Sequence, residues 1–143
     1  MIRKIYFYTP LALTCVALYG ALFMIYQPGP IDQFQRKVTP EIVRGGDSIT
    51  IESIVERTHE CRSIIYRSFH AKDGRVVYYD PSYRPWVPAG MEKYTAKVVV
   101  PEGLAAGLLV YRVHVEFFCN SLQDWLGKGT NFPLPDVPLQ YEG

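Results

Sequence analysis

One stretch near the start of the chain, Ile5 to Tyr26 (IYFYTPLALTCVALYGALFMIY), contains no charged residue. At about 1.5 Å per residue, an α-helix of this length spans roughly 33 Å, enough for a hydrocarbon core of about 30 Å. The run is apolar all round rather than striped, which disfavours a buried core helix. It is also longer than the apolar part of a typical signal peptide, and no small-x-small cleavage site follows it. We therefore predict a retained transmembrane anchor over residues 1–27.

Basic residues on the two flanks of this run predict its orientation. Arg3 and Lys4 precede it closely, whereas Arg36 and Lys37 follow at a greater distance. Because positive residues accumulate on the cytoplasmic side, we expect a single-pass membrane protein with a cytoplasmic N-terminus and a periplasmic or extracellular domain. Residues 28–35 begin with Pro-Gly-Pro and are expected to form a short tether.

The remaining residues, 36–143, alternate between apolar and polar side chains. This pattern indicates strands over the following ranges: 38–43, 48–58, 61–71, 76–79, 94–100, 108–119 and 130–141. Asp73-Gly74 is a strong hairpin signal, and residues 80–90, with three prolines, are expected to form a loop. About seven short strands without a helical period predict an all-β, antiparallel β-sandwich.

Residues 98–119 combine a Pro-Glu-Gly turn, then Leu104, then Tyr111 in an alternating strand. This pattern resembles the corner between the fifth and sixth strands of immunoglobulin and fibronectin type III domains. The resemblance implies an immunoglobulin-like sandwich, although the two tryptophans, Trp86 and Trp125, do not fall on the third strand as in antibody domains. Small anchored domains of this kind resemble those encoded by bacteria and their phages.

Two of the three cysteines lie in the predicted domain. In an immunoglobulin-like sheet, Cys61 begins the third strand and Cys119 ends the sixth, and these strands are antiparallel neighbours. We therefore predict a disulfide between Cys61 and Cys119, closing a loop of about 59 residues; two buried free thiols are the alternative. Cys15 lies inside the apolar run and is expected to be inert.

Two surfaces are candidates for contact with other molecules. The first is a possible partner surface whose composition, rich in aromatic residues and arginine, is typical of interfaces: Tyr78, Tyr79, Tyr83, Arg84 and Trp86. The alternative is an edge loop, stiffened by proline, that covers the sheet. In an immunoglobulin-like topology, the loop 120–129 lies at the same pole as the N-terminus. Its apolar side chains are therefore expected to contact the membrane or the tether, unless Trp125 caps the core: Leu122, Trp125 and Leu126.

No catalytic or metal-binding pattern is found in the sequence. The three histidines (His59, His70 and His114) are scattered, and no second pair of ligands has metal-binding spacing around His59 and Cys61. We expect no metal, no cofactor and no enzymatic activity. The net charge of +1 argues against a nucleic-acid partner.

These features predict a non-enzymatic bitopic membrane protein. Its partners would be membrane lipid and an unidentified protein, with the sandwich used for protein–protein interaction or as a structural component of an envelope or virion assembly. One alternative is a phage-type, membrane-active accessory protein for lysis or exclusion, acting through its helix and the membrane-proximal loop. A secreted domain released by cleavage is another. The sequence leaves the oligomeric state open.

Overall fold

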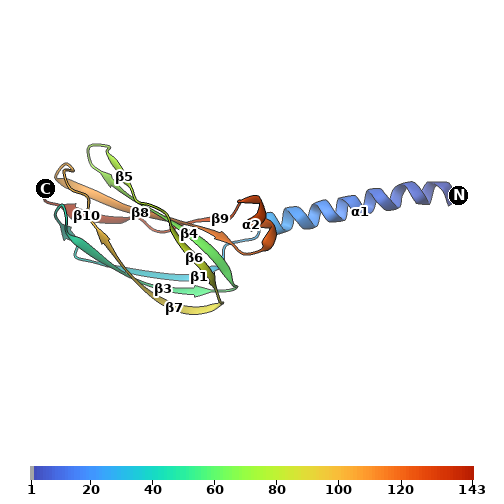
Figure 1. The fold of residues 1–143 in the computed structure, drawn as a ribbon, viewed down its shortest axis with the longest axis horizontal. Coiled ribbons are helices and arrows are strands. Elements are labelled where there is room, and N and C mark those ends of the chain that lie inside the picture. Colours follow the sequence, from blue (N-terminus) through green and yellow to red (C-terminus); the bar gives the residue numbers. More distant parts are fainter. Residues whose placement is uncertain (1) are drawn as a thin grey trace.

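The computed structural model of the protein describes the backbone of residues 2–143 and the side chains of residues 10–32 and 34–143. One helix, α1 (Ile2–Ile25), stands out from one end of a β-sandwich that is formed by the rest of the chain (Figure 1). The C-terminus lies at the opposite end of the sandwich (Figure 1). The molecule is therefore elongated, with the helix extending away from the domain.

Within the described residues, no helix has both the length and the apolar character that a membrane crossing requires. The predicted anchor over residues 1–27 is therefore wrong. The predicted localisation, a single-pass membrane protein with an outward domain, is wrong with it.

Two sheets pack face to face to form the sandwich. The first sheet joins three strands in the order β1 (Ile31–Thr39), β3 (Ser48–Arg57) and β7 (Gly90–Val99). The second sheet has the order β2 (Ile42–Val43), β10 (Val137–Tyr141), β8 (Gly107–Phe118), β4 (Cys61–Ala71) and β5 (Val76–Tyr78). Two further strands complete it: β6 (Ser82–Val87) pairs with β4, and β9 (Thr130–Pro133) pairs with β8. A short helix, α2 (Ser121–Leu126), lies beside the end of α1 (Figure 1).

The predicted sandwich is confirmed, but its strands differ from the prediction of about seven antiparallel strands. The described residues contain ten strands, and β2 runs parallel to β10. Strand β1 begins at Ile31, inside the predicted tether 28–35, because its backbone pairs with β3. Strand β6 lies inside the segment 80–90 that was predicted as a loop. Pro85 is tolerated there because β6 pairs with β4 alone and so lies on a sheet edge.

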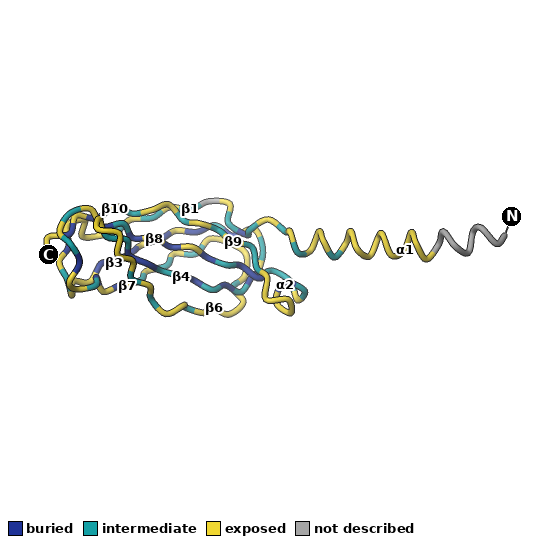
Figure 2. The backbone as a smooth tube through the Cα atoms, turned by 90° about the horizontal axis from the view of Figure 1, so that it is seen from above, coloured by how far each residue is buried: buried dark blue, intermediate teal, exposed yellow. Residues whose placement is uncertain are grey.

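Alternation along the strands determines which side chains fill the space between the sheets. The side chains of β3 alternate between buried and more exposed from Ile49 to Arg57, and those of β8 do so from Leu109 to Phe117. Figure 2 shows buried stretches along inner strands such as β4 and β8 and exposed stretches toward the margins of the sandwich. The largest fully buried apolar side chains come from both sheets: Ile49, Phe69, Leu109, Tyr111, Leu139 and Tyr141.

A disulfide joins Cys61 to Cys119, so the predicted bridge is confirmed. It forms because β4 and β8 are antiparallel neighbours in the second sheet, with Arg62 opposite Phe118. Cys61 begins β4 and Cys119 follows the last residue of β8, which leaves their Cα atoms 4.2 Å apart. The bridge fixes the end of the sandwich that carries α1.

Gln123 of α2 connects α1 to the sandwich. Its side chain is fully buried, and its Oε1 accepts a hydrogen bond from the backbone N–H of Cys119 at 2.8 Å. Its Nε2 donates to the carbonyl of Ile25 at 3.2 Å and to Oγ1 of Thr130 at 3.3 Å. Asn120 adds a second connection by donating to the carbonyl of Met24 at 2.9 Å. Amide side chains of the domain therefore satisfy carbonyls at the end of α1 that the helix itself leaves free.

Candidate functional site

The five residues of the predicted partner surface divide into two groups. Tyr78 and Tyr83 are 77% and 72% exposed, and Trp86 on the edge strand β6 is exposed as well. Tyr79 and Arg84 are half-buried. Tyr79 packs against the core, and Arg84 lines a cavity between the sheets. The prediction therefore combined an exposed aromatic set with two residues that belong to the interior.

The exposed tyrosines lie on the outer face of the second sheet. Tyr83 is paired with Ile64 of β4 and Tyr78 with Ser68, which are positions between the inward-facing residues of that strand. Tyr66 lies between these two positions on β4 and stacks on His114 of β8 with ring centroids 4.6 Å apart. Tyr66, Tyr78, Tyr83 and His114 form a surface that we call the aromatic face.

The residues predicted near the N-terminal pole lie on α2, next to α1. Trp125 is 81% exposed and so does not cap the core, while Leu122 is half-buried and Leu126 exposed. A salt bridge between Arg62 and Asp124 attaches this helix to β4. The predicted membrane contact depended on the anchor and loses its basis without it.

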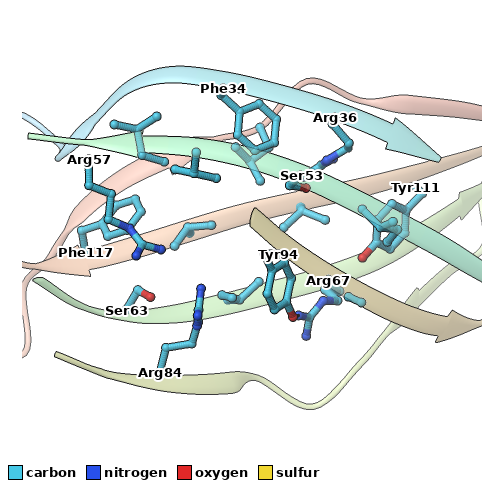
Figure 3. Close-up of a pocket in the computed structure, with 18 residues that line it drawn as sticks. Phe34, Arg36, Ser53, Arg57, Ser63, Arg67, Arg84, Tyr94, Tyr111 and Phe117 are labelled. Carbon is cyan, nitrogen blue, oxygen red and sulfur yellow. The ribbon is translucent and has the colours of Figure 1, made fainter. Parts of the chain in front are cut away.

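Four arginines face the space between the sheets, each from a different strand. They are Arg36 of β1, Arg57 of β3, Arg67 of β4 and Arg84 of β6. Together with Ser53, Ser63, Tyr94, Tyr111 and apolar side chains they line a cavity of about 70 Å³, which we call the arginine cavity (Figure 3). None of the 18 residues that line the cavity is an aspartate or a glutamate.

One carboxylate, that of Glu92 on β7, contacts two of these arginines. Its Oε1 accepts a hydrogen bond from Nη2 of Arg84 at 2.6 Å. Its Oε2 is 2.6 Å from Nη1 of Arg57 and forms an ion pair with it. Arg57 is only 7% exposed, and in Figure 3 it points toward Arg84 across the cavity. The ion pairs of Glu92 therefore connect the first sheet, which carries Glu92 and Arg57, to Arg84 in the second sheet.

The other two arginines have only neutral partners. Arg67 donates to Oγ of Ser82 and, from Nη2, to the hydroxyl of Tyr94 at 3.2 Å. Arg36 donates from Nη1 to the carbonyl of Pro135 at 3.3 Å, while its Nε is buried without a hydrogen-bond partner. Four guanidinium groups and one carboxylate leave three positive charges without a balancing negative charge among the described residues of the cavity.

Burial determines the direction of the pKa shifts of Arg36 and Tyr111, and pairing with arginines that of Glu92. Burial lowers the pKa of Arg36, and the nearby charge of Arg67 lowers it further, although a guanidinium stays protonated at neutral pH. Burial raises the pKa of Tyr111 to about 12 in spite of Arg67 and Arg36, so its hydroxyl is neutral. Burial alone would raise the pKa of Glu92, but the hydrogen bond from Arg84 and the charge of Arg57 outweigh it and lower that pKa. The carboxylate is thus ionised, and the phenol does not offset the arginines.

The arginine cavity was not predicted from the sequence, although a signal was present. Continuing the alternation of Ile49, Ile51, Ser53 and Val55 by one step gives Arg57 as an inward-facing residue. The same step from Cys61 through Ser63 and Ile65 gives Arg67. Because charged residues are expected to face water, Arg57 and Arg67 were not predicted to face inward.

Two clusters elsewhere resemble reactive sites. Ligand atoms of His59, Cys61 and Cys119 lie within 4.8 Å of one another, but both sulfurs belong to the disulfide and are not thiolates. Oγ of Ser68 is 3.0 Å from Nε2 of His70 on the outer face of β4. The nearby carboxylate of Asp136 does not orient that imidazole, because Arg112 binds it through hydrogen bonds from Nε and Nη2. Neither cluster makes a reactive site as it stands.

Neither a protein-family model nor a curated protein matches this chain. Among solved structures, an alkylpurine DNA glycosylase, AlkC, from Pseudomonas fluorescens is similar over 77% of this chain and 30% of its own, with 13% identity and a TM-score of 0.52. The sporulation control protein Spo0M of Bacillus subtilis has 9% identity and a TM-score of 0.44 over 81% of this chain and 51% of its own. A CARDB domain from Pyrococcus furiosus has 12% identity and a TM-score of 0.44 over 82% of this chain and 96% of its own.

The chain thus spans about 30% of the glycosylase and about half of the sporulation protein. At 13% identity, the likeness to the glycosylase extends to the fold alone. The structure therefore defines a β-sandwich domain that contains one disulfide and is preceded by a helix.

Proposed function

We propose that this chain is a non-enzymatic binding protein whose β-sandwich presents the aromatic face to another protein. The observation that carries the proposal is the exposure of Tyr78 and Tyr83 on a regular sheet surface beside the Tyr66–His114 stack. Tyrosine combines a large apolar area with a hydroxyl that can bond, and it is enriched at the centre of interfaces. Isolated apolar residues on a surface are common, but several aromatic rings on one face favour a contact site.

The rigidity of this face also supports the proposal. Strand β4 pairs with β8 from Arg62 to Ala71, and Tyr78 and Tyr83 lie on strands that pair with β4, so the backbone of the aromatic face belongs to paired strands rather than to loops. Tyr66 is held further by a hydrogen bond from its hydroxyl to Glu116. Side chains that are already ordered lose little conformational entropy on binding, which favours affinity.

We further propose that the sandwich is of the immunoglobulin-like type. The order β1-β3-β7 in one sheet and β10-β8-β4 in the other matches strands A, B and E and strands G, F and C of such domains. The disulfide differs from that of antibody domains, because it lies within one sheet rather than between the two.

Photo-crosslinking from defined positions tests the proposed surface. A photoreactive amino acid at position 83, in cells that make the full chain, should give one reproducible protein adduct. The same amino acid at position 95, where Thr95 is exposed on β7 of the first sheet, serves as the control. Tyr78→Ala should weaken the adduct from position 83, because it removes a neighbouring ring. An identical adduct pattern from positions 83 and 95, or no adduct from position 83, would contradict the proposal.

A further inference from the structure

We infer that the arginine cavity binds a small oxyanion, such as phosphate, sulfate or a short carboxylate, between the two sheets. Arg36, Arg57, Arg67 and Arg84 would be its ligands. This inference does not depend on the proposed protein-binding function, because the cavity lies inside the sandwich and the aromatic face lies outside it.

The first argument is the balance of charge. Four guanidinium groups line the cavity, Glu92 offsets one of them, and the lining itself contributes no carboxylate. The hydroxyl of Tyr111 is neutral and offsets nothing. Arg57 is almost fully buried and the other three arginines are half-buried. Charges taken out of water are unfavourable unless a counter-charge meets them, and here the missing counter-charge is negative. An anion in the cavity would supply it.

The second argument is a buried donor that still lacks an acceptor. Nε of Arg36 is buried without a hydrogen-bond partner. Guanidinium groups offer parallel N–H donors that match the paired oxygens of a phosphate, sulfate or carboxylate. Ser53 and Ser63 are buried in the same lining and place two hydroxyls beside the arginines.

The third argument is size. The cavity holds about 70 Å³, several times the roughly 10–15 Å³ that one water molecule needs by the same kind of measure. That space admits a small oxyanion but not a nucleotide or a folded segment. Arg57 is nearly inaccessible from outside, which favours a free ion over an acidic side chain presented by another protein. Apolar neighbours such as Phe34, Ile51 and Val113 lower the local polarity and so strengthen the attraction to an anion.

The test compares phosphate with chloride on the full chain at constant ionic strength. Sodium phosphate should bind saturably in isothermal titration calorimetry. It should also raise the thermal midpoint above that in chloride, because an ion that binds the folded state stabilises it. Repeating the titration with sulfate and with isobutyrate then distinguishes an inorganic oxyanion from an organic carboxylate. Equal midpoints and no saturable heat with all three anions would overturn the inference.

Substitutions at neighbouring positions on β1 test the site itself. Arg36→Met should weaken phosphate binding about tenfold or more, because it removes a charged donor without leaving a carboxylate unpaired. Lys37→Met makes the same change of charge at the next, exposed position and should bind phosphate as the wild type does. Equal weakening by both substitutions would show a diffuse charge effect and overturn the inference.

Stability without phosphate separates a binding role from a structural one. Arg36→Met should unfold in chloride at a midpoint no lower than that of the wild type, because it removes an unbalanced charge from the interior. Arg36→Lys serves as a second variant in case the methionine variant does not fold. It keeps the charge but loses the planar fork, and should bind phosphate more weakly than the wild type. If Arg36→Lys and Arg36→Met both bind phosphate with the affinity of the wild type, the assigned site is refuted.

Discussion

Replacing Gln123 with leucine perturbs the junction between α1 and the sandwich at one fully buried side chain. Leucine is similar in size, so the change removes hydrogen bonds while keeping most of the packing. Three bonds are lost: from Cys119 N–H to Oε1, and from Nε2 to the carbonyl of Ile25 and to Oγ1 of Thr130. The expected effect is therefore the cost of breaking a polar connection in a region that water does not reach.

The magnitude follows from these three contacts. A typical intramolecular hydrogen bond contributes about 1 kcal/mol net, so their loss lowers the free energy of unfolding by about 3 kcal/mol. The N–H of Cys119 contributes most, because it is left without an acceptor beside the disulfide. For a domain of roughly 110 residues, this loss corresponds to a thermal midpoint about 12 °C lower.

Urea unfolding followed by circular dichroism measures this loss, and Gln140→Leu serves as the matched control. Gln140 is exposed on β10, so the same substitution there should change the free energy of unfolding by less than about 0.5 kcal/mol. Hydrogen exchange adds a local readout, since amides at residues 24–27 should exchange faster in Gln123→Leu. A variant within about 0.5 kcal/mol of the wild type, with unchanged exchange there, would refute the assigned role of Gln123.

Three further predictions concern the disulfide and two titratable groups. Replacing both Cys61 and Cys119 with alanine should lower the free energy of unfolding by about 4 kcal/mol, because two residues separated by 58 positions are no longer joined in the unfolded chain; an unchanged urea midpoint would contradict this. The pKa of Glu92 is lowered in the folded state. Its contribution to stability is therefore present above its usual pKa of 4.5 and is lost as the pH falls through the folded value, and Glu92→Gln should flatten this acid limb of the stability profile. The pKa of Tyr111 is raised from 10.0 to about 12. Its contribution is therefore full below pH 10 and falls by about 3 kcal/mol as the pH rises to 12, a loss that Tyr111→Phe should abolish.

The strands were predictable because they depend on local alternation, and the disulfide because the resemblance to immunoglobulin-like sandwiches places the third and sixth strands side by side. Residues 48–58, 61–71 and 108–119 alternate in the sequence and form β3, β4 and β8 with almost those limits. Once β4 and β8 are placed side by side, their ends bring Cys61 and Cys119 together. The pairing of these two strands therefore followed from the resemblance, and the strands themselves from the pattern of side chains.

Other features depend on contacts that no local pattern encodes. Strand β6 forms around Pro85 because β4 offers it a free edge, and β1 begins inside a proline-rich segment because β3 extends that far. The absence of charge from Ile5 to Tyr26 predicted an anchor, although no helix among the described residues has the length and character to cross a membrane. The connection of α1 through Gln123 involves residues about 100 positions apart, which composition cannot reveal.

The arginine cavity was not predicted because its residues break the rule that made the strands predictable. Alternation places Arg57 and Arg67 on inward positions, where an apolar side chain would stabilise the sandwich without any loss of solvation. The other end of the sandwich already supplies an apolar core around Phe69 and Leu109, so folding does not require charged residues between the sheets. Four arginines around one space, with a single carboxylate among them, are costly for folding and suited to holding an anion. A departure from the apolar pattern on inward strand positions is therefore the signal in this sequence that most directly indicates a binding site.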